Sequence, residues 1–593
     1  MGMLQVLLCS VLLCGLSLGR KITVDLRVET RAAVNTIDEL FTCVTLDWWP
    51  SSKCDYGNCP WGQNSALNID LQSVVLRKAL QAFQGQYLLR IGGSLSDFVV
   101  YKVPDSPSSI SSKRYCSQPD FSAPTLHTKI GYEFMSGCLE MERWNALHSF
   151  CAATRCNLIF GLNALYGRTP PVPCPESTIC RKPSPPSCCT SWSGHWDPAN
   201  AEALLRYSYK RGHNIYGLEL GNELVGKKGI QAHVNVDDYL EDWRRFNRLL
   251  DAVYGPKDGA GEGGEGVGRG KKEEEGKGEG GKGVAKGIKR PLTIGPDTSW
   301  MSDWVSVWLL KIGLEDESAA LEPDMVSHHL YSMGAGINEN AWQVALNVTV
   351  MNTVVALGKD VHATVRKASP RSRILVGEAG GAYNSGANNV TNTFNSGFWF
   401  LDQLGVFAAN GHGAYCRQTL AGGFYSLLDS KTLLPNPDYY SLLAWTKLMG
   451  RRSLHVFAIP TKQPLVLRSY AHCLSTRSPL YKPGAIVVLL INTSNATHVK
   501  VNLETEGKSD LASTRRQDFH FTSACPGTLR QILACRSVLL NGQPLEVTPD
   551  TLDFGAGIVG LQRDAAPLVL TPLSYAFIAF PEARAEACDD APG

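Results

Sequence analysis

Two glutamates stand at the ends of short apolar segments that have the character of buried strands. Glu223 follows Ile215–Leu220 in the run LELGNEL, and Glu378 follows Ile374–Gly377 in the run ILVGEAGG. A carboxylate among Leu, Val and Gly loses hydration, so this position is costly unless the group has a chemical role there. An ion-paired structural role explains one such glutamate but not the pair. Two carboxylates at strand ends can supply a proton and a nucleophile or base, which predicts glycoside hydrolysis.

Other chemistries at strand ends need a metal cluster, a Schiff-base lysine or a phosphate-binding loop. The dipeptide His328-His329 ends another strand-like segment and could hold a metal, but no third ligand stands at a recognisable spacing. We therefore expect neither a metal nor a cofactor. We expect His328 to position the substrate or the nucleophile instead.

Short apolar runs alternate with segments of helical period along the first three quarters of the chain. The expected strands are Leu40–Leu46, Tyr87–Ile91, Asn157–Leu162, Ile215–Leu220, Leu292–Gly295, Met325–His329, Ile374–Gly377 and Ala414–Arg417. The expected helices are Leu71–Gln84, Trp144–Ala153, Ala199–Lys210, Val236–Tyr254, Asp303–Ile312, Asn340–Arg366, Phe394–Ala408 and Tyr439–Met449. Eight strand–helix pairs in order predict an α/β fold of the (β/α)8 TIM-barrel type. A doubly wound open sheet is the alternative, but no G-x-G-x-x-G motif follows the first strand.

The pattern changes after residue 452. Strand-like runs follow with turn residues between them, at Pro464–Tyr470, Ala485–Asn492, His498–Leu503 and Tyr575–Ala579. These runs predict a C-terminal β-sandwich domain over residues 453–593. Residues 20–36 contain the alternating run KITVDLRV and are expected to add a strand to that sandwich, which leaves 37–452 as the catalytic barrel.

The N-terminus has the features of a secretory leader. Residues 1–19 are uncharged and apolar and end in Ser-Leu-Gly, with small residues where a signal peptidase cleaves. No later apolar run is long enough to span a bilayer, so at most peripheral membrane association is expected. Most of the 18 cysteines lie beyond the leader and are expected to form disulfides. Expected glycosylation sites are Asn347, Asn389, Asn492 and Asn495. We expect a secreted or cell-wall protein, or one of a vacuole or lysosome.

The charge balance restricts the class of partner. The chain of 593 residues has 57 Lys and Arg against 55 Asp and Glu, a net charge of +2, so no nucleic-acid partner is expected. Residues 256–290 hold 9 basic and 7 acidic residues with 13 Gly, which leaves 48 of each sign elsewhere. This insert is expected to be a disordered surface loop, with a polyanion-binding or cleavable linker as the functional alternative. Residues 170–196 are expected to form a Cys- and Pro-rich, disulfide-tied loop. We expect a monomer.

Several motifs together resemble the heparanase family of retaining (β/α)8 glycosidases, and most closely its plant-type β-glucuronidases. They are YLLRIGGSLSDF (87–98), LIFGLNALYGR (158–168), LELGNEL (218–224), VSHHLY (326–331), VGEAGGAYNSG (376–386), YCRQTLAGGFYSLLD (415–429) and NPDYYSLLAWTKLMG (436–450). The motifs span the expected barrel from end to end, and the C-terminal sandwich is compatible with the resemblance.

The resemblance implies double displacement with Glu223 as general acid/base and Glu378 as nucleophile, their carboxyl groups about 5–5.5 Å apart. Asn222 would bind the sugar 2-hydroxyl, and Tyr331 and His328 would orient the nucleophile. The implied glucuronate pocket consists of Asp47, Ser94, Asn163, Tyr383, Asn384, Ser385, Gln418, Gly423 and Tyr425. Backbone N–H groups of Asn384 and Ser385 would hold the uronate carboxylate.

The sequence also departs from the animal heparanases. They are cut around an internal linker that has no counterpart here between the first two strands, and the balanced charge does not favour a strongly sulfated substrate. We therefore expect a β-glucuronidase acting on proteoglycan or arabinogalactan glycans or on small glucuronides. An endo-acting heparanase on heparan sulfate is the first alternative. A catalytically inactive carbohydrate-binding protein is the second, and the presence of both glutamates is evidence against it.

Overall fold

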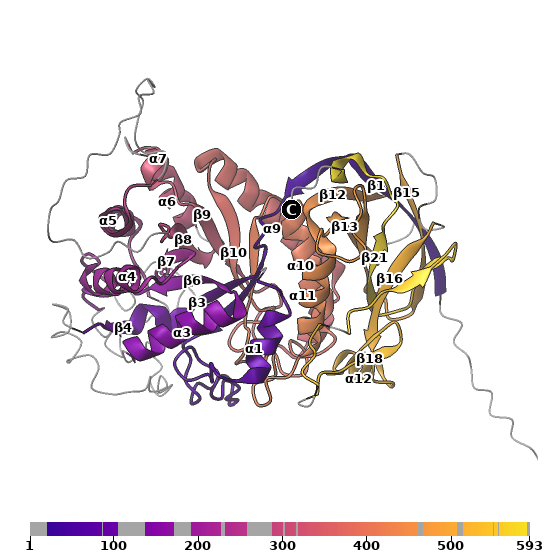
Figure 1. Cartoon of the computed structure of the whole chain (residues 1–593), viewed down its shortest axis with the longest axis horizontal. Helices are drawn as coiled ribbons and strands as arrows, with labels where there is room; N and C mark the ends of the chain where they lie inside the picture. Colours follow the sequence, from indigo (N-terminus) through magenta and orange to yellow (C-terminus); the bar gives the residue numbers. More distant parts are fainter. Residues whose placement is uncertain are drawn as a thin grey trace, which may run out of the picture.

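The computed structural model describes residues 20–85, 87–104, 137–170, 191–226, 232–257, 288–300, 303–315, 318–459, 466–506, 511, 514–548, 551–555 and 557–589. Figure 1 shows a helix-ringed barrel beside a strand-rich unit to which both ends of the chain contribute. The expected leader, most of the Cys- and Pro-rich loop and most of the 256–290 insert lie outside the described residues.

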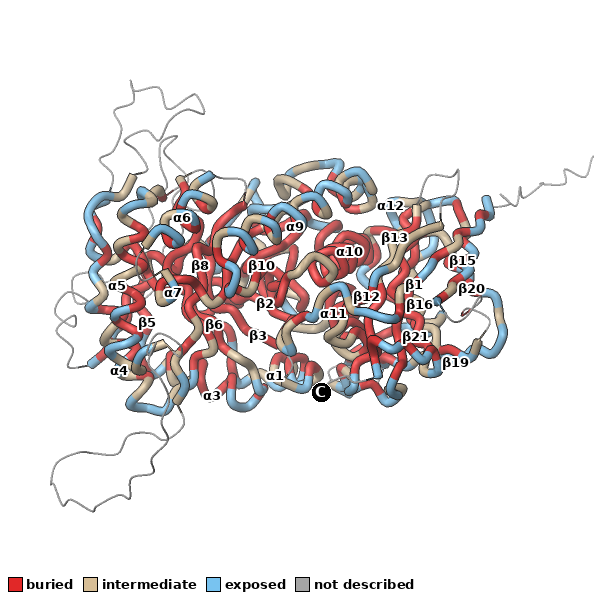
Figure 2. Tube along the Cα trace, turned by 90° about the horizontal axis from the view of Figure 1, so that it is seen from above, coloured by how far each residue is buried: buried red, intermediate tan, exposed pale blue. Residues whose placement is uncertain are grey.

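Eight parallel strands close into a barrel, in the order in which they occur along the chain. They are β2 (Thr42–Asp47), β3 (Leu88–Gly92), β6 (Asn157–Leu162), β7 (Gly217–Leu220), β8 (Leu292–Ser299), β9 (Met325–Leu330), β10 (Arg373–Ala379) and β11 (Ala414–Arg417). Both faces of such strands are covered, so they are buried along almost their whole length (Figure 2). The (β/α)8 prediction is confirmed.

Helices surround the barrel. They are α1 (Val74–Gln81), α3 (Met141–Thr154), α4 (Ala199–Arg211), α5 (Val236–Tyr254), α6 (Asp303–Gly313), α7 (Ser318–Leu321), α8 (Ala341–Val344), α9 (Val348–Ala368), α10 (Ser396–Ala409) and α11 (Pro437–Leu448). The single helix expected over Asn340–Arg366 is wrong, because Asn347 begins a new helix there. Its side chain accepts the N–H of Thr349 and so satisfies an otherwise unpaired amide at the start of α9.

The first and last barrel strands are joined covalently. Cys43 on β2 and Cys416 on β11 lie opposite each other in parallel register and form a disulfide across a sequence separation of 373 residues. They belong to an apolar cluster that also contains Leu88, Ile159, Ile294, Met325, Leu375 and Ala414. The side chains two residues further along the strands, such as Thr45 and Arg90, lie on the same strand faces and are largely polar. An apolar layer therefore underlies a polar one.

The second unit is a continuous sheet of eleven strands. Its members are β1 (Arg20–Thr36), β12 (Met449–Ala458), β13 (Leu467–Leu474), β14 (Ile486–Asn492), β15 (Thr497–Thr505), β16 (Arg516–Ser523), β17 (Val538–Leu540), β18 (Gln543–Leu545), β19 (Leu561–Arg563), β20 (Leu568–Leu570) and β21 (Ser574–Phe580). Strands distant in the sheet order, such as β15 and β21, share one apolar core, so the sheet folds over on itself. The strand β1 pairs with β12 and β15, which confirms the expected N-terminal contribution.

The helices α10 and α11 lie between the barrel and this sheet (Figure 1). Almost all of α10 is buried, which explains why its sequence is apolar on every side (Figure 2). The ring of Tyr470 packs so closely on Gly405 that an added Cβ would lie 2.2 Å from it. Tyr575 contacts both helices: its ring centroid lies 5.5 Å from that of Phe398 in α10, and its hydroxyl lies 3.0 Å from that of Ser441 in α11. The two units therefore share one interface core.

In the part of the chain that the structure describes, no helix combines the length and apolarity that crossing a bilayer requires.

Candidate active site

The two glutamates lie at the same end of the barrel, where the parallel strands finish. Glu378 is the second-last residue of β10, and Glu223 follows β7 in a turn with φ of +53°. The N–H of Glu223 donates to the carbonyl of Asp297 at 3.0 Å, which holds this turn against β8. Each glutamate is only 8% exposed. Reactive groups of (β/α)8 enzymes occupy this end of the barrel.

His329 connects the two glutamates. Its Nδ1 lies 3.0 Å from Oε1 of Glu223 and 3.9 Å from Oε2 of Glu378. These two oxygens are therefore within about 7 Å of each other. This separation agrees with the short distance between the two carboxyl groups of retaining glycosidases and excludes most of the longer distances found in inverting ones. The other ring nitrogen of His329 lies 2.8 Å from Oδ1 of Asp297. The imidazole thus lies between the two glutamates and is itself anchored by Asp297.

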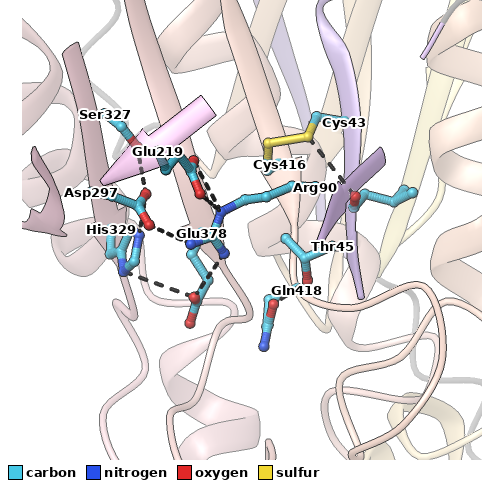
Figure 3. Close-up of a disulfide and its surroundings, with 11 residues drawn as sticks. Cys43, Thr45, Arg90, Glu219, Asp297, Ser327, His329, Glu378, Cys416 and Gln418 are labelled. Carbon is cyan, nitrogen blue, oxygen red and sulfur yellow. Dashed lines mark hydrogen bonds and ion pairs between the residues drawn. A yellow bond between two sulfur atoms is a disulfide. The ribbon is translucent and has the colours of Figure 1, made fainter. Parts of the chain in front are cut away.

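Arg90 on β3 is the centre of a fully buried polar network (Figure 3). Its Nε donates to both carboxylate oxygens of Glu219, at 2.8 and 3.1 Å, and its Nη1 donates to Oε2 of Glu378 at 3.2 Å. Its Nη2 donates to Asp297 and, at 2.9 Å, to Oδ1 of Asn222. One guanidinium therefore fixes side chains from three other strands, which its planar fork of donors suits well.

Burial and charge compete at each of these groups. Burial lowers the pKa of the Arg90 guanidinium, but the surrounding carboxylates outweigh it and raise that pKa well above its ordinary value. Burial likewise opposes charge on His329, yet Asp297 and Glu378 raise its pKa well above the usual range. For Asp297, Arg90 and His329 outweigh burial and hold the pKa below its ordinary value. At Glu219 the effect of burial outweighs the charge of Arg90 and raises the pKa of the carboxyl group to about 8. The pair Glu223 and Glu378 thus lies beside two groups that keep their positive charge, Arg90 and His329.

Sequence reasoning missed Arg90, Glu219, Asp297 and His329. A signal was present for two of them, because Arg90 and Glu219 are charged residues inside runs that are otherwise typical of buried strands. An isolated buried charge is prohibitively costly, so opposite charges in two such strands predict an ion pair. Asp297 carried no comparable signal, and His329 was singled out only as one half of the His328-His329 pair at a strand end.

His328 is not where we expected it. Adjacent strand residues point to opposite faces, and in β9 it is His329 that faces the glutamates. The His328 side chain lies on the outer face of β9, packed against Trp300 and Phe407 with ring centroids 6.1 and 5.6 Å away. Its Nε2 is 3.0 Å from Nε2 of His412. The predicted role of His328 at the reaction centre is therefore wrong, and His329 takes that position.

The His328–His412 pair is built for neutral rings. Nδ1 of His412 is 3.1 Å from the carbonyl of Asn410 and must donate to it, so its Nε2 accepts from Nε2–H of His328. Burial, reinforced by the neighbouring ring, lowers the pKa of His328, and burial lowers that of His412 to about 3. Both rings resist protonation in the folded protein.

This pair should make the fold acid-sensitive. A depressed folded-state pKa contributes stability above the unfolded value and loses it as the pH falls. From His412 alone we expect the free energy of unfolding to fall by about 1.5 kcal/mol between pH 6.5 and pH 5. Denaturant unfolding across this range measures the slope. The variant His412→Gln should show a shallower slope, and an unchanged slope would contradict the assignment.

Tyr331 contacts Glu378 directly. Its hydroxyl donates to Oε1 of Glu378, the oxygen that Arg90 does not hold. Burial and the charge of Glu378 raise the pKa of Tyr331 well above its ordinary value, so the hydroxyl keeps its proton. Two donors, one on β3 and one just after β9, thus orient the carboxylate of Glu378.

A second polar chain connects β2 and β11 beside the glutamates. Gln418 accepts from the hydroxyl of Thr45, and its Nε2 donates to Oδ2 of Asp47 at 2.9 Å and approaches the hydroxyl of Tyr425 at 3.4 Å. Oδ1 of Asp47 is buried with no hydrogen-bond partner among the described residues. Burial, aided by the charge of Glu378, raises the pKa of Asp47 to about 8. Gly423 packs against the Tyr425 ring. The structure thus brings these predicted residues together.

Three other predicted residues differ in their surroundings. Asn222 is held by Arg90 and by its own N–H, which donates to Oδ2 of Asp97 at 2.8 Å. Both ends of the Asn163 side-chain amide are hydrogen-bonded to backbone. Its Nδ2 donates to the carbonyl of Val99, and its Oδ1 accepts the N–H of Leu165. Asn163 therefore supports the loop after β6 and does not present its amide to a ligand. Ser94 is half-buried at the start of a 3-10 helix, Ser94–Phe98.

Tyr383, Asn384 and Ser385 follow β10 in an unusual conformation. Asn384, Ser385 and Gly386 have φ of +58°, +66° and +79°, a left-handed conformation that non-glycine residues rarely adopt. Successive amides in such a turn point into one concavity, which suits an anion. None of the hydrogen bonds among the described residues uses the N–H of Asn384 or Ser385. We call these two residues and Gly386 the amide nest.

Predicted glycosylation sites differ in accessibility. Asn347, Asn389 and Asn495 are exposed. Asn492 is fully buried, and its Nδ2 donates to the carbonyls of Thr497 and Thr571, each at 2.8 Å. A glycan attaches to this nitrogen, so the prediction for Asn492 is wrong for the folded protein. Among the described residues, no group of three or more His, Cys, Asp or Glu side chains is arranged to hold a metal ion.

Comparisons with known proteins agree with this geometry. The family model "Glycosyl hydrolase family 79, N-terminal domain" matches residues 23–260 and 283–405. Heparanase-like protein 1 of Arabidopsis thaliana is 34% identical over 93% of this chain and 92% of its own length. Baicalin-beta-D-glucuronidase of Scutellaria baicalensis is 30% identical over 96% of this chain and 94% of its own length. The solved structure of an alpha-L-arabinofuranosidase from Thermotoga maritima has a TM-score of 0.57 at 11% identity, covering 94% of this chain and 99% of its own. That likeness concerns the fold alone.

Proposed function

Because the chain belongs to glycosyl hydrolase family 79, we propose that it is a retaining β-glucuronidase that acts on glucuronate-bearing glycans or glycosides. The carboxylate pair at Glu223 and Glu378, joined through His329, carries this proposal. The plant relative named as a baicalin-beta-D-glucuronidase supports the glucuronide class, because baicalin is its named substrate.

In the first step Glu378 attacks the anomeric carbon while Glu223 protonates the departing oxygen. The donors Tyr331 and Arg90 suit Glu378 to the anionic role, because both stabilise a carboxylate and aim its oxygens. Within the part of the chain that the structure describes, the Glu223 carboxylate has a single hydrogen-bond partner, Nδ1 of His329. That unequal set of donors is the observation that distinguishes nucleophile from acid.

In the second step Glu223 accepts a proton from water, which attacks the glycosyl–Glu378 ester and releases the sugar with its configuration retained. The same residue thus acts as acid and then as base. Asn222, held by Arg90, is placed beside Glu223 to bind the sugar 2-hydroxyl, where contacts strengthen as the transition state forms.

Recognition of the uronate carboxylate is assigned to the amide nest. Its backbone donors carry no charge of their own and are already aligned, so binding an anion costs little reorganisation. On the other side of the site a sugar hydroxyl is assigned to Asp47, whose Oδ1 has no hydrogen-bond partner among the described residues and whose Oδ2 is held by the Gln418 amide.

We also propose that the chain enters the secretory pathway and is glycosylated at exposed sequons such as Asn347, Asn389 and Asn495. Support comes from the disulfides Cys43–Cys416, Cys54–Cys59, Cys151–Cys156, Cys473–Cys588 and Cys525–Cys535, which are typical of exported proteins. Enzymatic removal of N-glycans should reduce the mass of the protein isolated from its source. An unchanged mass would contradict glycosylation.

The substrate class is tested with three 4-nitrophenyl glycosides of identical leaving group. We expect kcat/KM for the β-D-glucuronide to exceed that for the β-D-glucoside and the β-D-galactoside by at least about 100-fold, since only the uronate fills the nest. No preference for the glucuronide would refute the proposal. Shortening of heparan sulfate chains, followed by size-exclusion chromatography, would instead indicate endo-acting heparanase activity.

A further inference from the structure

We propose that a small hairpin in the connection from β2 to α1, Cys54–Cys59, is a specificity clamp that holds the amide nest in its uronate-binding shape. We call this segment the clamp hairpin. The inference rests on the proposed function, because it assigns residues to the choice between a uronate and a neutral sugar. Asp55 and Tyr56 are positioning residues here, since they act through the nest and do not contact the reacting atoms.

The clamp hairpin contacts both non-glycine residues of the nest. The hydroxyl of Ser385 donates to Oδ2 of Asp55 at 2.5 Å, and Nδ2 of Asn384 donates to the hydroxyl of Tyr56 at 2.8 Å. Nε1 of Trp61, just beyond the hairpin, donates to the hydroxyl of Ser385 at 2.8 Å. Each side chain of the nest is thus tied to a segment more than 320 residues away in the sequence.

These ties act where the backbone needs support. Asn384 and Ser385 adopt a left-handed conformation that costs conformational energy for residues with a Cβ, and it persists only when the surroundings impose it. The hydrogen bonds with Asp55, Tyr56 and Trp61 use side chains of the nest, and no described residue accepts the backbone N–H of Asn384 or Ser385. The side chains therefore secure the turn while its amides remain available for a ligand.

The clamp hairpin is itself rigid. Asp55 and Asn58 exchange backbone hydrogen bonds of 2.8 and 2.9 Å around Tyr56 and Gly57, both at positive φ as in a type I′ turn. The disulfide Cys54–Cys59 closes the same segment. A rigid support loses little entropy when it holds a second loop, which makes it effective as a clamp.

The charge of Asp55 argues for holding and against direct substrate binding. A carboxylate beside an anion site is unfavourable unless it is neutralised. Lys53 supplies the counter-charge, with Nζ 2.9 Å from Oδ1 of Asp55 and 4.5 Å from the centre of the Trp49 ring. One Asp55 oxygen is thus paired with Lys53 and the other with Ser385. Each oxygen thus already has a partner within the protein, which favours a supporting role for Asp55.

The clamp predicts a selective loss. In Asp55→Asn the amide replaces the anionic acceptor, which weakens the bond from Ser385 and releases Lys53. We expect kcat/KM for 4-nitrophenyl β-D-glucuronide to fall relative to the β-D-glucoside by about 10- to 100-fold, mostly through KM, since only the uronate uses the nest. The Tyr56 side chain is half-exposed, and Tyr56→Phe removes only its hydroxyl. This variant should keep the fold and shift the same ratio by a smaller factor.

The matched control is Asp70→Asn, an exposed aspartate of the same connection that accepts the N–H of Gln72 and does not contact the nest. It should leave the ratio unchanged. An unchanged ratio in both Asp55→Asn and Tyr56→Phe, or an equal loss on both substrates, would overturn the clamp. Failure of the proposed function is visible separately, because the unmodified enzyme would then show no preference for the glucuronide, and the clamp would fall with it.

Discussion

Glu378→Gln should lower kcat on an aryl β-D-glucuronide by roughly 10⁴- to 10⁶-fold, because the amide cannot form the glycosyl–enzyme bond. The fold should survive. The change is isosteric, and acidic groups outnumber cations in the network around Arg90 and His329, so losing one negative charge leaves no cation unpaired. Steady-state kinetics with thermal unfolding as a control measures both effects.

Glu223→Gln provides the contrast that separates the two roles. We expect a loss of about 10²- to 10⁴-fold on a phenyl glucuronide, whose departing oxygen needs a proton. On 4-nitrophenyl glucuronide the leaving group departs without help, so the glycosyl–enzyme should accumulate and give a burst of nitrophenol. Glu378→Gln should give no burst on either substrate. A burst from Glu378→Gln, or near-normal turnover by either variant, would contradict the assignment.

Arg90→Met should affect stability and catalysis together. Removing this guanidinium leaves Glu219 and Asp297 buried beside no cation but His329, and we expect the free energy of unfolding to fall by about 3–5 kcal/mol. Glu378 also loses the donor on Oε2, which should lower kcat by at least about 100-fold. Chemical denaturation and glucuronide kinetics are the measurements.

Arg373→Met is the matched control for Arg90. Arg373 pairs with Asp38 at 2.8 Å, but its side chain is 36% exposed, so we expect a loss of no more than about 1 kcal/mol. The double variant Arg90→Met/Glu219→Gln should regain part of the stability but none of the turnover, because Glu378 stays without its donor. If Arg90→Met proves too unstable to study, Arg90→Lys keeps the charge without the planar fork and should still lose turnover. Normal turnover by Arg90→Lys would contradict the positioning role.

The barrel itself was predictable because its strands and helices differ in local pattern. Buried parallel strands are short apolar runs, and the helices between them have a helical period with capping residues, as Val236–Tyr254 shows by matching its predicted bounds. Glu223 and Glu378 stood out because each follows such a run. The split of the helix at Asn347 was missed, since a capping residue inside a helical pattern has no effect on its period.

The choice between His328 and His329 shows a limit of local pattern. A strand that is buried on both faces has no polar side to indicate which residue faces inward. The answer depends on the pairing of β9 with β10, where His329 lies opposite Glu378 and His328 lies opposite Val376. Only the register of the closed barrel determines it.

The sequence by itself therefore determined the (β/α)8 class, the second strand-rich unit and the two carboxylates, because these follow from hydrophobic period and from the cost of a charge at a buried strand end. The tertiary structure alone decided the buried charged network around that pair. Arg90 reaches Glu219, Asp297 and Glu378 across 129, 207 and 288 residues, and Ser385 meets Asp55 across 330. Such contacts depend on barrel closure, which brings all eight strand ends to one face. No local pattern in the chain specifies which of these side chains then come into contact, or at what distance.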